Sequence, residues 1–178
     1  NDYSEGAHSD ILRCLAETNF AQQNGYGEDE YSAAAKELLK QKLQNPDAVL
    51  FFLSGATQTN LIVIAALLRV HEAVISARTG HIYANETGAI EATGHRIITV
   101  ETADGKLRPE DIRTVLEAHT LRPHVVKPRM VYISNSTELG TIYLKEELKG
   151  LSSYCREQNL FLFMDGARLI YGLVGKET

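Results

Sequence analysis

The sequence predicts an α/β fold in which helices flank a mostly parallel sheet. Apolar runs of strand length alternate with longer amphipathic stretches along the 178 residues. Several runs are apolar at every position, as expected for strands that are covered on both faces. With 44% hydrophobic and 23% charged residues, the composition is that of a globular chain that buries a substantial core.

Each element follows from its local pattern. The expected strands are AVLFFL (48–53), AVISA (73–77), RIITV (96–100), MVYIS (130–134) and LFLFM (160–164). Helical spacing of apolar residues predicts helices over 28–43, 61–70, 109–119 and 144–158. The segment LRPHVVKPR (121–129) is the most loop-like stretch between them.

Charge and cysteine content narrow the classes of partner. The net charge is −5 and no basic stripe is present, so neither nucleic acid nor a membrane is an expected partner. No segment approaches the roughly 18 apolar residues of a membrane span. Cys14 and Cys155 lie far apart and are interpreted as free thiols in a reducing compartment, which predicts a cytoplasmic location.

The stretch Ser54-Gly55-Ala56-Thr57 separates an expected strand from a strongly apolar helix. Small residues at this point let backbone N–H groups face outward at the helix N-terminus, where the helix dipole favours an anion such as phosphate. The stretch matches neither a Walker A loop nor the glycine pattern of dinucleotide folds. The alternative is an ordinary helix cap formed by Ser or Thr.

Two further polar side chains fall at the ends of expected strands. His81 follows a glycine turn after 73–77, and Asp165 directly follows 160–164, so both belong at the carboxyl edge of the sheet. A buried carboxylate needs a cationic partner, and an Asp165–Arg168 ion pair is the simple alternative to a ligand. For His81 the alternative is a surface loop residue. No metal site is expected.

Acidic residues after His81 have a simpler interpretation. Glu86 and Glu91 are expected on a partly exposed helix, with solvated carboxylates.

The motifs together resemble the threonine aldolase and β-eliminating lyase family of pyridoxal-phosphate enzymes, which have the aspartate-aminotransferase-like fold (fold type I). The resemblance extends over essentially the whole chain, through NDYSEGAH, NGYGEDEY, SGATQTN, GHIYANETGAIEATGH, YISNSTELGTIY and FMDGARLIYG. It implies pyridoxal 5'-phosphate as cofactor. The implied cofactor-binding residues are Gly55, Ala56, Thr57, His81, Asp165 and Arg168.

The resemblance also implies a role for each of these residues. Asp165 would pair with the protonated pyridine nitrogen, which lets the ring act as an electron sink. Gly55, Ala56 and Thr57 would form the phosphate turn. His81 would stack on the ring and serve as the catalytic base, and Arg168 would bind the substrate carboxylate.

The implied reaction is aldol cleavage of threonine or allo-threonine to glycine and acetaldehyde. Two departures from the family pattern bear on it. Ala56 stands where glycine is usual, which requires a backbone without positive φ. Thr137 stands where many threonine aldolases have a second histidine, so a related β-eliminating lyase or aminotransferase activity also fits.

The family places its catalytic lysine beyond the DGAR motif, and none of the lysines in this sequence lies in that context. The expected domain organisation has two parts. Residues 1–45 would form a helical segment that contributes to the site. Residues 46–178 would form an incomplete cofactor-binding large domain that lacks the catalytic lysine, with the C-terminal small domain absent. An inactive truncated fragment or a degenerate homologue is the alternative to an active lyase. A full-length protein is expected to be a homodimer or homotetramer.

Overall fold

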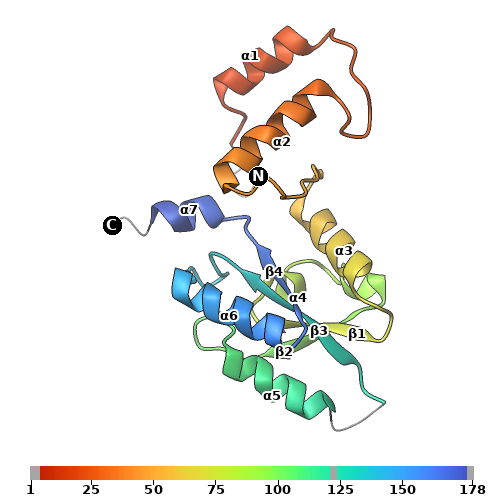
Figure 1. The fold of residues 1–178 in the computed structure, drawn as a ribbon, viewed down its shortest axis with the longest axis vertical. Coiled ribbons are helices and arrows are strands. Elements are labelled where there is room, and N and C mark those ends of the chain that lie inside the picture. The colour runs from red at the N-terminus through yellow and green to blue at the C-terminus, as the bar shows by residue number, and fades with distance from the viewer. Residues whose placement is uncertain (1–4, 121–123, 176–178) are drawn as a thin grey trace. The chain divides into compact units, whose positions relative to one another are not determined.

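Four parallel strands form the centre of residues 53–178 in a computed structural model that describes residues 5–120 and 124–175 (Figure 1). The strands are β1 (Glu72–Ala77), β2 (Arg96–Val100), β3 (Lys127–Ser134) and β4 (Phe161–Asp165), in the order β2-β1-β3-β4. Every neighbouring pair is parallel, which confirms the predicted sheet class. The chain order reverses between β1 and β3, so this sheet has a topological switch point there.

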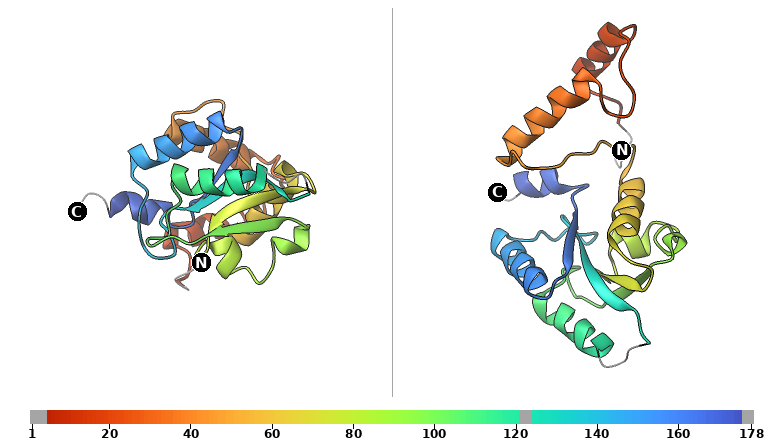
Figure 2. Two further views of the ribbon diagram at one scale, coloured as in Figure 1. Left: turned by 90° about the horizontal axis from the view of Figure 1, so that it is seen from below. Right: turned by 45° about the vertical axis from the view of Figure 1, so that its right-hand side comes forward.

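Helices cover both faces of this sheet, as the continuous apolar strands predict. Figure 2 shows the two helical layers on either side of the strands. On one face, α5 (Pro109–Thr120) and α6 (Lys145–Glu157) pack on Ile75 and Val131. On the other face, α3 (Ala56–Leu67) and the short α4 (His81–Ala84) pack on Val74 and Tyr132. Successive residues of one strand therefore enter different cores.

Residues 1–52 form a separate compact unit with two helices in its described part. Helix α1 (Ser9–Thr18) begins after His8, whose Nδ1 accepts a hydrogen bond from Asp10 N at 3.2 Å. Helix α2 (Glu30–Leu43) begins after Asp29, whose carboxylate accepts hydrogen bonds from the Ser32 backbone and hydroxyl. Neither helix buries a residue completely. Asn1 to Ser4 of the first motif lie outside the described residues.

The remaining elements are the 3₁₀ turn η1 (Glu91–Thr93) and helix α7 (Leu169–Val174), neither of which the sequence pattern predicted. The described residues contain no helix that is long and apolar enough to cross a membrane. The two cysteines are free thiols, with Cys14 exposed and Cys155 buried.

The expected strand at 48–53 is wrong, because this segment is irregular. Val49 and Phe51 leave 77% and 80% of their surface exposed. A strand requires a neighbour for its backbone hydrogen bonds, and no ladder of the described sheet includes these residues. Hydrophobic content by itself therefore misidentified the segment.

The expected loop at 121–129 is also partly wrong. Strand β3 begins at Lys127, while 121–123 lie outside the described residues. Pro128 hid the start of the strand, because proline has no N–H to donate to a ladder. The ladder accommodates it with a register shift: Ala73 pairs with Pro128, and Val74 pairs with Met130.

Candidate functional site

The predicted site residues lie around the carboxyl ends of β1, β3 and β4. His81 follows β1 after a short turn, and Asp165 is the last residue of β4, paired in register with Ser134 at the end of β3. Helix α3 precedes β1 in the chain, so its N-terminus belongs to the same edge. Ligands of open α/β sheets bind at this edge, next to the switch point.

The 54–57 loop leads directly into α3. Gly55 is the N-cap residue and makes no side-chain capping hydrogen bond, which rules out the alternative of a Ser or Thr cap. The Ser54 hydroxyl instead donates to Gln58 Oε1 at 2.7 Å. Ala56 is the first residue of the helix and has no positive φ, so its methyl group causes no strain. The first-turn N–H groups thus remain available for an anion.

A glycine positions His81 at the start of α4. A Cβ atom on Gly80 would clash with Ser76 Oγ and approach the Ala77 carbonyl oxygen at 3.0 Å, so the turn requires a residue without a side chain. The Nδ1 atom of His81 lies 2.9 Å from Glu86 Oε1. The interpretation of Glu86 as a solvated carboxylate is therefore wrong, since it is only 4% exposed. Glu86 lies in a turn and Glu91 in η1, so they share no helix.

Asp165 accepts hydrogen bonds from neutral donors. Ala167 N donates to Oδ1 at 3.0 Å, and the Tyr132 hydroxyl donates to Oδ2 at 2.8 Å. Asn60 Nδ2 contacts the same Oδ2 at the long distance of 3.5 Å. No Lys, Arg or His among residues 5–120 and 124–175 forms an ion pair with Asp165. The described part of the chain thus provides no cationic partner for this half-buried carboxylate.

Arg168 does not neutralise Asp165, so the simple ion-pair alternative is wrong. Its Nη2 atom lies 3.4 Å from Glu138 Oε1 and donates to the Ser136 carbonyl oxygen, also at 3.4 Å. Its Nε atom is buried and has no hydrogen-bond partner within the described residues. The guanidinium therefore retains unused hydrogen-bonding capacity.

A continuous series of polar contacts links His81, Asp165 and Arg168. Asn60 links Asp165 to the His81–Glu86 pair, because its Nδ2 atom, which contacts Asp165, also donates to Glu86 Oε1 at 2.6 Å. Ser134 completes the series, with its Oγ at 2.7 Å from Glu138 Oε1 and 3.4 Å from the Tyr132 hydroxyl. The order along the series is Arg168, Glu138, Ser134, Tyr132, Asp165, Asn60, Glu86 and His81.

Burial keeps the Tyr132 hydroxyl, in the middle of this series, protonated, so that it can donate to Asp165. Tyr132 is 1% exposed, and burial together with the charge of Asp165 raises the pKa of its hydroxyl. The hydroxyl therefore remains a donor at neutral pH.

Thr137, at the position of the family's second histidine, belongs to the supporting loop. It is 2% exposed, and its Oγ1 atom lies 2.7 Å from Thr141 Oγ1. Thr141 Oγ1 in turn donates to the Asp104 carbonyl oxygen at 2.6 Å. Thr137 thus fixes the loop that carries Glu138.

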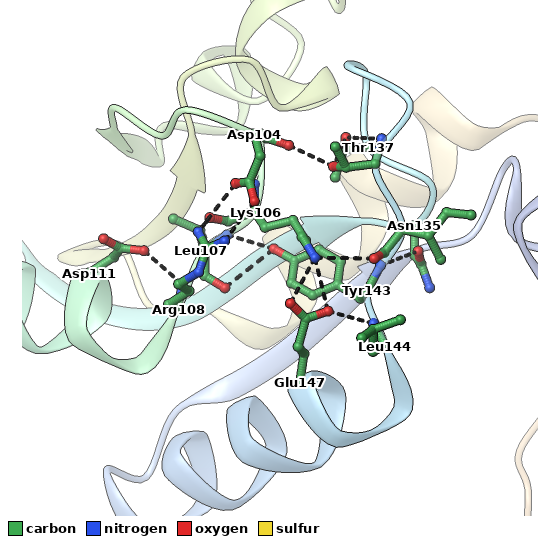
Figure 3. A network of polar contacts seen from close by, with 12 residues as sticks. Asp104, Lys106, Leu107, Arg108, Asp111, Asn135, Thr137, Tyr143, Leu144 and Glu147 are labelled. Carbon is green, nitrogen blue, oxygen red and sulfur yellow. Dashed lines mark hydrogen bonds and ion pairs between the residues drawn. The ribbon is translucent and has the colours of Figure 1, made fainter. Parts of the chain in front are cut away.

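A neighbouring network of polar contacts joins the segment 104–108 to the first turn of α6 (Figure 3). The Lys106 ammonium contacts both Glu147 carboxylate oxygens, at 2.7 and 2.9 Å. Burial raises the pKa of Glu147, but the hydrogen bonds from Lys106 and Leu144 N outweigh burial, and the pKa is lowered overall. Tyr143 N, just before α6, donates to the side chain of Asn135, just after β3, at 3.1 Å.

Comparison with known proteins agrees with this architecture. The family model of the beta-eliminating lyases matches residues 10–173. The chain belongs to the beta-eliminating lyase family. Members of this family depend on pyridoxal phosphate, and solved structures with this fold include a PLP-bound C-S lyase from Staphylococcus hominis, 14% identical with a TM-score of 0.59 over 88% of this chain and 40% of that one.

Threonine aldolases are among the relatives. The low specificity L-threonine aldolase of Pseudomonas aeruginosa is 34% identical over 94% of this chain and 49% of that protein. That of Escherichia coli K12 is 26% identical over 84% of this chain and 44% of that protein. A solved Leishmania major threonine aldolase is 50% identical, with a TM-score of 0.94 over 97% of this chain and 50% of that one. The chain spans about half the length of these relatives.

Sequence patterns missed several residues of the site. Asn60 and Tyr132 looked like parts of an apolar helix and an apolar strand, and both are 1% exposed. Their one available signal was a polar atom within an otherwise apolar run, which requires a buried partner. Ser134 and Glu138 carried no signal beyond their departure from the family motif.

Proposed function

We propose that this family member is a PLP-dependent carbon–carbon lyase that cleaves threonine or allo-threonine to glycine and an aldehyde. The observation that carries the proposal is Asp165: a half-buried carboxylate that holds neutral donors and no cationic partner within the described residues. A protonated pyridine nitrogen would bring to Asp165 a positive charge and an N–H donor.

The residues present fit pyridoxal phosphate. Gly55, Ala56 and Thr57 offer uncapped backbone N–H groups to its phosphate. Asp165 would pair with its ring nitrogen, and His81 would lie against the ring. When bound, the cofactor supplies an electron sink for the carbanion produced by Cα–Cβ cleavage.

His81 is suited to accept the β-hydroxyl proton. Glu86 Oε1 already accepts a hydrogen bond from Asn60 Nδ2, so we place the hydrogen that joins Glu86 and His81 on Nδ1 of His81. In the neutral ring Nε2 is then the free acceptor. We propose that Nε2 takes the β-hydroxyl proton while Arg168 holds the substrate carboxylate. The Cα–Cβ bond breaks, the aldehyde leaves, and Cα receives a proton to give glycine.

Cofactor affinity tests the role of Asp165. Asp165→Ala in the whole protein is expected to abolish retention of pyridoxal phosphate in an absorbance titration. Exposed Asp47→Ala is the matched control and should titrate like the parent. Unchanged affinity in Asp165→Ala would show that the carboxylate does not meet the ring nitrogen.

A second variant separates chemistry from binding. His81→Ala should lower turnover of threonine, measured as acetaldehyde release, far more than it lowers cofactor affinity. If turnover is untouched, His81 is a loop residue without a role as base. Intact mass after incubation with the cofactor and borohydride reports in parallel whether one lysine forms a stoichiometric adduct.

A second candidate activity, β-elimination, is favoured by the burial of Thr137, whose hydroxyl is committed to Thr141. The products distinguish the two activities. Aldol cleavage of threonine gives acetaldehyde and glycine, whereas elimination gives 2-oxobutanoate and ammonia.

We also propose a cytoplasmic homodimer or homotetramer. Two free thiols support a reducing compartment. Sedimentation equilibrium of the whole protein tests the oligomeric state, and a monomer at all concentrations would reject it.

A further inference from the structure

The guanidinium of Arg168 is engaged loosely. Its two contacts, to Glu138 Oε1 and to the Ser136 carbonyl oxygen, are both 3.4 Å long. Charge-assisted hydrogen bonds between arginine and carboxylate are normally about 2.7–2.9 Å and are frequently bidentate. A pair held at this length is weaker than one that Arg168 could form with a free carboxylate.

Glu138 is nevertheless held in place by the protein. Its side chain is 13% exposed, and Ser134 Oγ donates to the same Oε1 atom at 2.7 Å. The turn that carries it is closed by Thr137 and Thr141. The carboxylate is therefore presented to Arg168 by a braced loop.

We propose that Glu138 determines how strongly this site binds carboxylate ligands, because its negative charge beside Arg168 competes with that of an incoming carboxylate. Only Nη2 of Arg168 contacts Glu138 and Ser136, so other guanidinium donors remain for a ligand carboxylate. A ligand bound there is repelled by the neighbouring charge of Glu138, which Ser134 holds in place. That the ligand is an amino acid rests on the proposed function; the competition between the two carboxylates does not.

Glu138→Gln is the informative variant, since the amide oxygen still accepts from Ser134 while the charge is removed. We expect the variant to bind carboxylates about threefold to tenfold more tightly, the range of a partly exposed ion pair. Glu91→Gln, at an exposed acid in η1, is the control and should bind as the parent does.

The first measurement needs no cofactor. Phenylglyoxal modifies free arginine, and peptide mass spectrometry gives the rate at Arg168, whose side chain is 29% exposed. Glu138→Gln should react faster, and acetate should protect it at concentrations threefold to tenfold lower than in the parent. Acetamide should protect neither protein. Equal or weaker protection by acetate in the variant would overturn the proposal and leave Glu138 as a brace of its loop.

The second measurement separates this inference from the proposed function. Pyridoxal phosphate is titrated into parent and variant, followed by glycine or glycinamide, with the cofactor absorbance as readout. Tighter glycine binding in the variant, with unchanged glycinamide binding, supports the role of Glu138. Absence of cofactor binding in both proteins would reject the proposed function, and the protection experiment would still decide the role of Glu138.

Discussion

Removal of one buried hydroxyl tests whether the polar series at the sheet edge holds Asp165. In Tyr132→Phe, the aromatic ring keeps its edge-to-face contact with Phe163, at 5.5 Å between centroids, and only the hydroxyl is lost. The donor to Asp165 Oδ2 at 2.8 Å disappears with it. The half-buried carboxylate then keeps Ala167 N and the long contact from Asn60.

The expected loss of stability in Tyr132→Phe follows from the negative charge of the acceptor, Asp165. A hydrogen bond to a charged group contributes about 1.5–3 kcal/mol, so the free energy of unfolding should fall by that amount. At about 2–4 °C per kcal/mol for a chain of this size, the melting temperature should fall by about 3–12 °C. Urea denaturation followed by circular dichroism measures the free energy directly.

Tyr83→Phe is the matched control, because Tyr83 is 44% exposed and lies in the same unit of the chain. Its free energy of unfolding should change by less than about 0.5 kcal/mol. An equally small change in Tyr132→Phe would refute the reasoning, because it would mean that Ala167 N and Asn60 satisfy Asp165 by themselves. Pyridoxal phosphate affinity should fall in Tyr132→Phe and remain unchanged in the control.

Three further predictions concern pH, thiol reactivity and the core. The hydrogen bond from Arg108, together with that from Lys106 N, lowers the pKa of Asp104 from 3.8 to about 2. Its stabilising effect is therefore complete above about pH 4 and lost as the pH falls through about 2, and Asp104→Asn should flatten the acid-unfolding curve in that window. Burial raises the pKa of Cys155 to about 11, so a thiol reagent at about pH 8 should label exposed Cys14 in the native protein and Cys155 after denaturation; rapid labelling of both would contradict this. Leu151→Ala, at a side chain that is 1% exposed, should lower the free energy of unfolding by about 2–5 kcal/mol in urea denaturation, and a change below 1 kcal/mol would contradict its place in the core.

Patterns local in the chain predicted most of the fold. The four strands that do form each contain an apolar run, and all six residues of β1 are buried, as such a run predicts. The segment 48–53 carried the same signal and failed, because pairing with a neighbouring strand is not encoded in the segment itself. The bulge beside Pro128 likewise depends on how β1 accommodates it.

The sequence by itself determined the fold class, the family motifs and the placement of His81 and Asp165 at the ends of strands. Those features depend on residue type and periodicity, which any stretch of chain carries alone. The tertiary structure decided the partners: Arg168 meets Glu138 rather than Asp165, and Glu86 is buried against His81 and Asn60. Asn60 and Asp165 are 105 positions apart in the chain, and only the packing of α3 beside the sheet brings their side chains together. Contacts of that kind depend on burial and distance, and no local pattern specifies either.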